Sequence, residues 1–169
     1  MHHGPLAADF RVIALDQVGF GQSDKPLANY HVGMLAEFLV DFLKAIGVPN
    51  ASLVGKSLGA SVAAYTAVHY PNTVDRLVLA DGAGYRALGA GPTPDAHMRQ
   101  INNGVTREET RQWLRQMFYN KSLAADGMVD ENLVMQLRSA FTISKILEAG
   151  QNGLGGIAMT RCAASTRQP

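Results

Sequence analysis

The sequence predicts an α/β fold: a partial doubly wound parallel sheet with a helical lid. In the first half, short apolar runs alternate with helical patterns in the order strand, helix, strand, helix, strand. That order is typical of parallel sheets whose strands are joined by helices. A G-x-S-x-G motif stands where one apolar run gives way to a helical pattern. After about residue 86 only helical patterns follow, and these predict the lid.

The first predicted strand is the apolar run Phe10–Leu15, which ends at Asp16. A glycine-rich loop over residues 16–26 follows it. Apolar residues then recur at spacings of three and four, which predicts an amphipathic helix that ends at Gly47 and Pro49. The residues of this stripe are Leu35, Phe38, Leu39, Phe42, Leu43 and Ile46.

The two remaining strands frame the motif. Residues 51–54 predict the strand that enters it, and residues 58–70 predict a buried helix that leaves it and is stopped by Pro71. Residues 76–80 predict the third strand.

The lid pattern begins with a capping box at residues 106–109. An apolar stripe follows it, and two further helices are predicted over residues 130–141 and 143–149. Trp113, Met117 and Phe118 are expected either to form the core of the lid or to line an apolar substrate pocket beneath it. The other apolar residues of these helices are Leu114, Leu133, Met135 and Leu137. A row of arginines is expected either to face solvent or to hold a substrate carboxylate: Arg107, Arg111 and Arg115. We therefore expect a sheet core over residues 1–86, the lid over 87–152 and an unpatterned tail over 153–169.

The composition and charge of the chain argue against several classes of function. The chain has 169 residues, of which 47% are hydrophobic and 17% charged, as in ordinary soluble globular proteins. A formal net charge of +1 gives no basis for binding nucleic acid or an anionic membrane. No apolar run reaches the length of a membrane span. The single cysteine, Cys162, cannot form an internal disulfide, so we expect a cytoplasmic protein.

The motif Gly55–Gly59 carries the chemistry. A serine on a sharp turn between strand and helix exposes its hydroxyl above the sheet, and such a turn favours glycine two residues to either side. Ser57 is therefore the predicted nucleophile. Leu58 follows it, and its backbone N–H, at the positive end of the next helix, is predicted to stabilise an oxyanion.

A phosphate-binding loop is the alternative reading of Gly55-Lys56-Ser57. That loop would need glycine at position 50, where the chain has Asn50, and a flexible segment where residues 52–54 predict a strand. The nucleophilic serine is the preferred interpretation.

Two motifs resemble those of the α/β-hydrolase superfamily: D-x-x-G-x-G-x-S from Asp16 to Ser23 and G-x-S-x-G from Gly55 to Gly59. The resemblance covers residues 9–86 closely and the lid more loosely. The lid's position is similar to that of the meta-cleavage-product (carbon–carbon bond) hydrolases and related esterases. Lys56 departs from that branch, which usually has asparagine before the serine.

The resemblance implies an acid and a histidine after the nucleophile in chain order. In the family both follow the lid, and neither these segments nor the family's first strands are found here, so we expect a chain truncated at both ends. Asp81, which ends the third predicted strand, is a candidate acid, with a turn residue as the alternative. The histidines at positions 31, 69 and 97 are interpreted as surface or structural residues.

Together these observations predict a serine hydrolase that needs no metal or organic cofactor. Its substrate would be a small carbonyl compound, either an ester or a ring-cleavage product with a scissile carbon–carbon bond. The alternative is a non-catalytic truncated remnant or binding protein, which the missing acid and histidine favour. Uncovered sheet edges would favour self-association.

Overall fold

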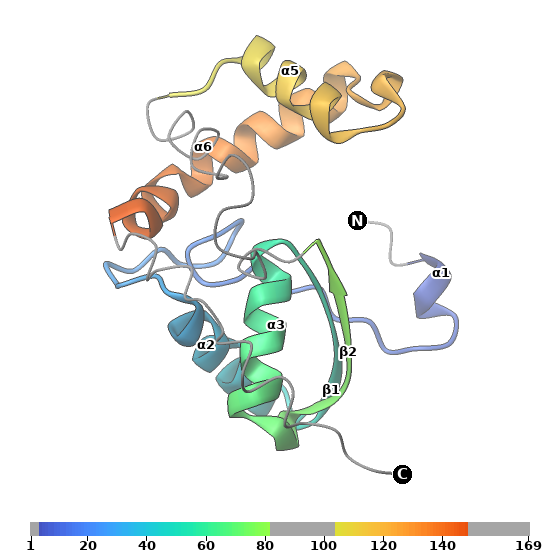
Figure 1. Ribbon diagram of the computed structural model, residues 1–169, viewed down its shortest axis with the longest axis vertical. Helices are drawn as coiled ribbons and strands as arrows, with labels where there is room; N and C mark the ends of the chain where they lie inside the picture. The colour runs from blue at the N-terminus through green and yellow to red at the C-terminus, as the bar shows by residue number, and fades with distance from the viewer. Residues whose placement is uncertain (1–3, 82–103, 149–169) are drawn as a thin grey trace, which may run out of the picture.

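The computed structural model describes residues 4–81 and 104–148 (Figure 1). The first described range carries a sheet with helices, and the second carries helices. The elements of the first range are α1 (Gly4–Ala7), α2 (Val32–Ala45), β1 (Ala51–Lys56), α3 (Leu58–His69), η1 (Pro71–Thr73) and β2 (Val74–Ala80). Those of the second are α5 (Arg107–Met117), η2 (Lys121–Leu123) and α6 (Asp126–Glu148).

The described sheet has two strands, β1 and β2, which run parallel. Leu53 pairs with Leu77, Gly55 with Leu79 and Lys56 with Ala80. Because α3 connects the two strands and packs on both of them, this is a strand–helix–strand unit. The partial parallel sheet predicted from the sequence is confirmed.

Helices α2 and α3 bury the main core beside this sheet (Figure 1). The helix expected from the apolar stripe is α2, which begins where the His31 side chain caps it: Nδ1 accepts a hydrogen bond from the Met34 N–H at 3.2 Å. One cluster of buried residues joins α2, α3, the preceding loop and α6: Val18, Tyr30, Val32, Leu35, Ala36, Val62 and Ile146. A second joins α2, β1 and α3: Leu43, Leu53 and Ala63.

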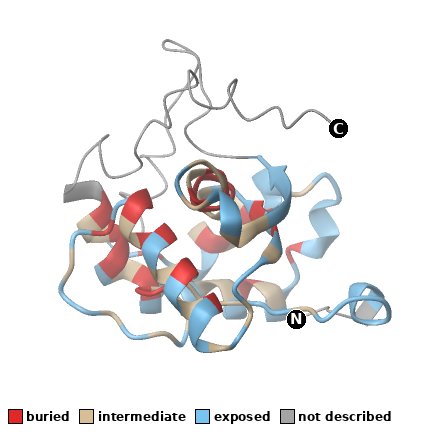
Figure 2. Cartoon of the chain, turned by 90° about the horizontal axis from the view of Figure 1, so that it is seen from below, coloured by how far each residue is buried: buried red, intermediate tan, exposed pale blue. Residues whose placement is uncertain are grey.

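The other side of the sheet is bare within the described residues. Buried positions gather in the helices, whereas every residue of β2 after Val74 is exposed (Figure 2). Val54 of β1 is 73% exposed and Val78 of β2 is 55% exposed. These apolar side chains lie in contact with water, an arrangement unusual for a parallel sheet.

The strand predicted over Phe10–Leu15 is wrong. The structure has no strand there, and Phe10 and Ile13 are 66% and 39% exposed. A strand exists only where a neighbour completes its hydrogen-bond ladder, and neither β1 nor β2 pairs with this run. The apolar pattern was present, but the partner that would make it a strand is absent from the described residues.

The helical region also differs in part from expectation. The capping box is confirmed at the start of α5, where Thr106 and Glu109 each bond the other's backbone. The two helices expected after it form a single helix, α6. Met135 and Leu137 are exposed at 58% and 52%, because α6 buries another face. Among the described helices, none combines the length and apolarity needed to cross a membrane.

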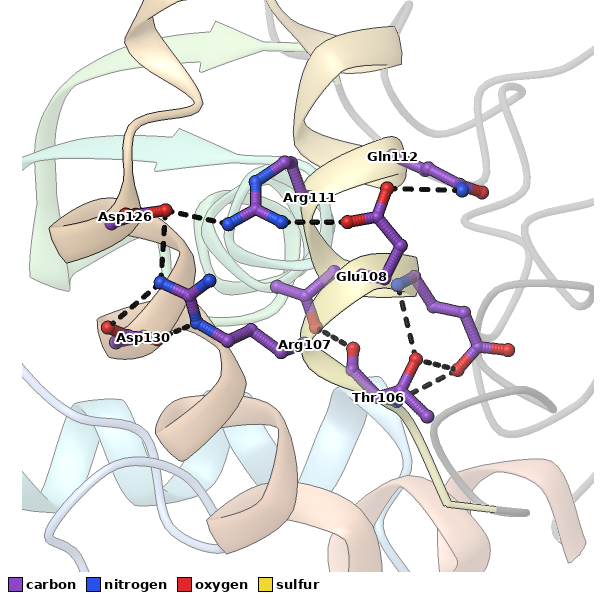
Figure 3. Close-up of polar contacts among 9 residues, drawn as sticks. Thr106, Arg107, Glu108, Arg111, Gln112, Asp126 and Asp130 are labelled. Carbon is purple, nitrogen blue, oxygen red and sulfur yellow. Dashed lines mark hydrogen bonds and ion pairs between the residues drawn. The ribbon is translucent and has the colours of Figure 1, made fainter.

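An ion-pair network holds α5 against α6 (Figure 3). The Arg107 guanidinium bonds Asp130 at 2.6 Å and contacts Asp126 at 3.0 Å. Arg111 bridges Asp126 and Glu108, both at 2.7 Å. Hydrogen bonds from the arginines lower the pKa of the Asp126 and Asp130 carboxyls below their ordinary value. Neither Arg107 nor Arg111 is thus free to hold a substrate carboxylate.

This network predicts a specific acid dependence of stability. A carboxyl whose pKa is lowered by folding stabilises the fold above its unfolded pKa of about 3.9, and that contribution is lost as the pH falls through the folded pKa. The double variant Asp126→Asn/Asp130→Asn should therefore lose less thermal stability than the parent chain between pH 5 and pH 2.

The matched control is Asp9→Asn/Glu131→Gln, which removes two exposed acidic groups for which no ion pair is found among the described residues. Melting curves at stepped pH should show the control following the parent chain. Equal acid sensitivity of the network variant and the parent would contradict the prediction.

Candidate active site

Ser57 lies on the turn between β1 and α3 with a φ of 52° and a ψ of −118°. Its N–H continues the sheet by donating to the Ala80 carbonyl at 3.0 Å, and its own carbonyl accepts from the first turn of α3. The side chain is exposed and makes no capping hydrogen bond. A non-glycine residue at positive φ is held there by its surroundings, and such strain is typical of a nucleophile on a strand–helix turn.

The two glycines of the motif have different surroundings. A Cβ on Gly55 would lie 2.3 Å from the Gly59 carbonyl oxygen and 2.6 Å from the Ala60 nitrogen, because α3 begins directly against the end of β1. A Cβ on Gly59 would meet no atom within 4 Å beyond its chain neighbours and the backbone of its own helix. The close approach of α3 to β1 therefore explains the glycine at position 55, and it does not explain the one at position 59.

Leu58 is the first residue of α3, so its backbone N–H has no acceptor within the helix. The positive end of the helix dipole lies at the same place. Its side chain is half-buried against the cluster that contains Val18 and Ile146. The structure thus places this N–H beside Ser57; its contribution to an oxyanion site stays a prediction.

The phosphate-loop interpretation does not fit the geometry. Residues 51–56 form β1, so no loop surrounds a phosphate before Ser57. Asn50 stands outside the strand, and its side-chain amide donates to the Asn72 carbonyl at 3.0 Å.

Asp81 comes directly after Ala80, the residue whose carbonyl accepts from the Ser57 N–H. It is exposed and has a φ of 50°. Ser57 and Asp81 are the two non-glycine residues at positive φ within the described parts of the chain, and both lie at the carboxyl end of the sheet. This is the edge where ligands of parallel sheets bind, so the placement agrees with either role proposed for Asp81.

The described histidines serve structural roles. His31 caps α2, and the His69 ring stacks on Tyr65 with centroids 4.0 Å apart. His69 ends α3, roughly 18 Å from Ser57 at the helical rise per residue. His97 falls outside the described residues. Within 4–81 and 104–148, then, no histidine is found in contact with the candidate nucleophile.

The second family-like motif forms an ordered loop beside the site. The Asp16 carboxylate accepts from the Gln22 N–H at 3.0 Å, and its carbonyl accepts from the Ser23 hydroxyl at 2.6 Å. Gly21, at a φ of 52°, lies so close that a Cβ would be 2.3 Å from the Asp16 carboxyl group. Asp16 therefore orders the loop.

The predicted apolar stripe of α5 forms a small local core. Leu114 is buried with Ala124 and Val129, and Trp113 and Phe118 pack against them. Met117 is 51% exposed and does not belong to this core. The described residues contain no grouping of histidine, cysteine or carboxylate side chains suited to a metal ion.

Two features of the structure were not predicted from the sequence. The Thr142 hydroxyl donates to the Gly19 carbonyl, which joins α6 to the loop before α2. Gln17 and Gln136 carry buried amide atoms for which no hydrogen-bond partner is found. A signal existed for Gln136: it is the polar member of a series spaced by seven residues, between Val129 and Ile143.

The chain is similar to a family model and to several known proteins. A family model described as the alpha/beta hydrolase fold matches residues 4–140. The dihydrolipoyllysine-residue acetyltransferase component of the acetoin cleaving system of Cupriavidus necator is 30% identical over 90% of this chain and 39% of its own length. The 2-hydroxymuconate semialdehyde hydrolase of Pseudomonas sp. strain CF600 is 41% identical over 47% of this chain and 28% of its own length.

Among solved structures, the meta-cleavage product hydrolase of Pseudomonas fluorescens IP01 superposes with a TM-score of 0.68 at 28% identity. The match covers 83% of this chain and 50% of that one. The chain thus spans half or less of the length of each of these three relatives.

The contrast between the two glycines predicts opposite effects of one substitution. Gly55→Ala forces β1 and α3 apart and should lower the free energy of unfolding by about 1–3 kcal/mol. Gly59→Ala places a methyl group in open space within a helix, and should be neutral or stabilising by up to about 1 kcal/mol. Urea unfolding followed by circular dichroism measures both variants. Equal effects of the two substitutions would contradict the account of the turn.

Proposed function

Because the chain belongs to the alpha/beta hydrolase fold family, we propose that it acts as a serine hydrolase with Ser57 as the nucleophile. The observation that carries the proposal is the backbone of Ser57, held at a φ of 52° on the turn between β1 and α3. A turn of that shape exposes the hydroxyl group at the carboxyl edge of the sheet.

In the proposed reaction the Ser57 hydroxyl attacks the carbonyl carbon of a small-molecule substrate. Its proton passes to a general base and then to the leaving group, and water releases the acyl product. The Leu58 N–H and the positive end of α3 stabilise the oxyanion. Asp81 is the candidate acid that would orient the base. The base itself is not supplied by any contact among the described residues.

The scissile bond is an ester or the carbon–carbon bond of a ring-cleavage product. The second choice is supported by the likeness to the 2-hydroxymuconate semialdehyde hydrolase and to the meta-cleavage product hydrolase. We also propose that α5 and α6 form the lid of the site. The Thr142–Gly19 hydrogen bond supports this, since it ties α6 to the loop whose Val18 packs in the same cluster as Leu58.

A non-catalytic binding protein of the same fold is the second candidate. The observation that favours it is the position of the described histidines, which cap α2 and stack on Tyr65 instead of contacting Ser57. A serine without its base loses most of its reactivity, so we expect slow turnover by the 169-residue chain.

Covalent labelling tests the proposed nucleophile without requiring turnover. A fluorophosphonate probe should modify the chain at Ser57, as mapped by peptide mass spectrometry, and Ser57→Ala should reduce labelling on the order of 10³-fold or more. Ser52→Ala is the matched control. Ser52 is an exposed serine of β1, and its hydroxyl donates a hydrogen bond to the Asp75 carboxylate. Labelling that persists in Ser57→Ala would refute the proposal, and absence of any labelling would favour the binding protein.

Substitution of Asp81 separates its two interpretations. Asparagine tolerates positive φ and removes only the charge, so the fold should be kept. If Asp81 orients the base, Asp81→Asn should slow labelling of Ser57 by roughly 10²-fold or more, whereas a turn residue would leave the rate unchanged. Asp81→Gly, which also suits the backbone, should reproduce the loss. Rates within twofold of the parent in both variants would exclude the acid role.

A further inference from the structure

One face of the β1–β2 sheet carries apolar side chains in contact with water. The register places Val54 beside Val78, and these residues are 73% and 55% exposed. Leu53, the strand neighbour of Val54, is buried in the cluster that joins β1 to α2 and α3. Because successive side chains of a strand point to opposite faces of its sheet, Val54 and Val78 lie on the face away from these helices.

This face has a charged residue at each end of its apolar centre. Lys56 lies two residues after Val54, is exposed, and forms no ion pair that is found within residues 4–81 and 104–148. At the other end, the Ser52 hydroxyl donates to the Asp75 carboxylate at 3.3 Å. Asp75 also contacts Arg76 at 3.7 Å, and 58% of its side chain stays exposed. We call this surface the bare face; it consists of Ser52, Val54, Lys56, Asp75, Val78 and Ala80.

The order of charges along the bare face is complementary to its own reverse. Lys56 and Ser52, which holds Asp75, each lie two residues from Val54 on opposite sides, about 7 Å along the strand. A second copy laid on this face with its strands antiparallel would bring its own Asp75 end over Lys56, and the valines would meet at the centre. With parallel strands the two Lys56 ends would coincide. Charge complementarity therefore selects a two-fold axis that crosses the strands at Val54.

We propose that the bare face binds a second copy of this chain and forms a symmetric, face-to-face dimer with antiparallel strands. Sheets packed in this way lie about 10 Å apart, with the side chains of both inner faces filling the space between them. Lys56 of each copy pairs with Asp75 of the other at the two ends of the contact. This arrangement gives a defined surface to the self-association expected from the sequence.

The size of the bare face sets the strength of the dimer. The shorter strand, β1, has six residues, so two strands offer a face of roughly 200 Å² per copy. Stable dimers bury about 800 Å² per partner. The dimer is therefore weak, with a dissociation constant on the order of 100 µM.

Sedimentation equilibrium of the whole chain tests the dimer directly. Between about 10 and 500 µM the parent chain should follow a monomer–dimer equilibrium. Val54→Thr/Val78→Thr keeps the side-chain shape and the strand propensity but places hydroxyl groups at the centre of the contact. It should weaken dimerisation about tenfold or more. A parent chain that stays monomeric, or that forms open-ended aggregates in place of a dimer, would overturn the proposal.

The charged ends allow a test that depends on the two-fold arrangement. Lys56→Glu alone opposes carboxylates at both ends of the contact, and Asp75→Lys alone opposes two ammonium groups. Each variant should therefore dimerise about fivefold more weakly than the parent, or less. An equimolar mixture of the two variants should recover association as a heterodimer, because each charged end then meets the opposite charge. Fluorescence-detected sedimentation with one variant labelled measures this recovery.

Lys44→Glu and Asp41→Lys are the matched controls. Lys44 and Asp41 form an exposed ion pair on α2, which packs on the other face of the sheet. These variants, alone or mixed, should dimerise as the parent does, and circular dichroism should show that all variants keep the parent fold. If the valine variant fails to fold, the mixture of Lys56→Glu and Asp75→Lys decides. Failure of that mixture to associate, or equal losses in the controls, would overturn the proposal, whatever the result of Ser57 labelling.

Discussion

The close approach of α3 to the end of β1 is the constraint on which the candidate site depends. A side chain at position 55 would overlap the backbone of the first helical turn, so the strand and the helix can meet only at a glycine. Once they meet, one residue is left to reverse the chain between them, and Ser57 takes the strained conformation that results. The exposed hydroxyl and the free N–H groups of the helix start are consequences of the same contact.

The sequence was sufficient to predict an element where the residues that stabilise it lie close to it in the chain. The turn at Ser57, the capping box of α5 and the stripe of α2 were predicted because each depends on residues a few positions apart. The run Phe10–Leu15 failed because a strand needs a second strand, which periodicity cannot reveal. The split of α6 was wrong for a related reason: Thr142, where the pattern weakened, is fully buried and bonded to a distant loop.

The positions of the candidate site residues in the fold, as distinct from their roles, were predictable to the same extent. Ser57, Leu58 and Asp81 are adjacent to strand ends, so their neighbourhood follows from the order of the elements. The hydrogen bond from Thr142 to Gly19 was not predictable, because nothing in either segment indicates that the two segments meet. This contact emerges only when α6 is placed against the loop before α2.

The hydrogen bond between Thr142 and Gly19 spans 123 positions of the chain. By contrast, the ion pairs and the small core that join α5 to α6 connect residues that lie much nearer to each other in the sequence. Within residues 4–81 and 104–148, α6 joins the other elements through this hydrogen bond and through Ile146 in the main cluster. Units that are each cohesive internally open as separate cooperative blocks. Amide hydrogen exchange should consequently divide the chain at this junction, with α5 and α6 opening together while the β1–α3–β2 unit stays protected. Such opening would expose the cluster around Leu58 without unfolding the turn that holds Ser57.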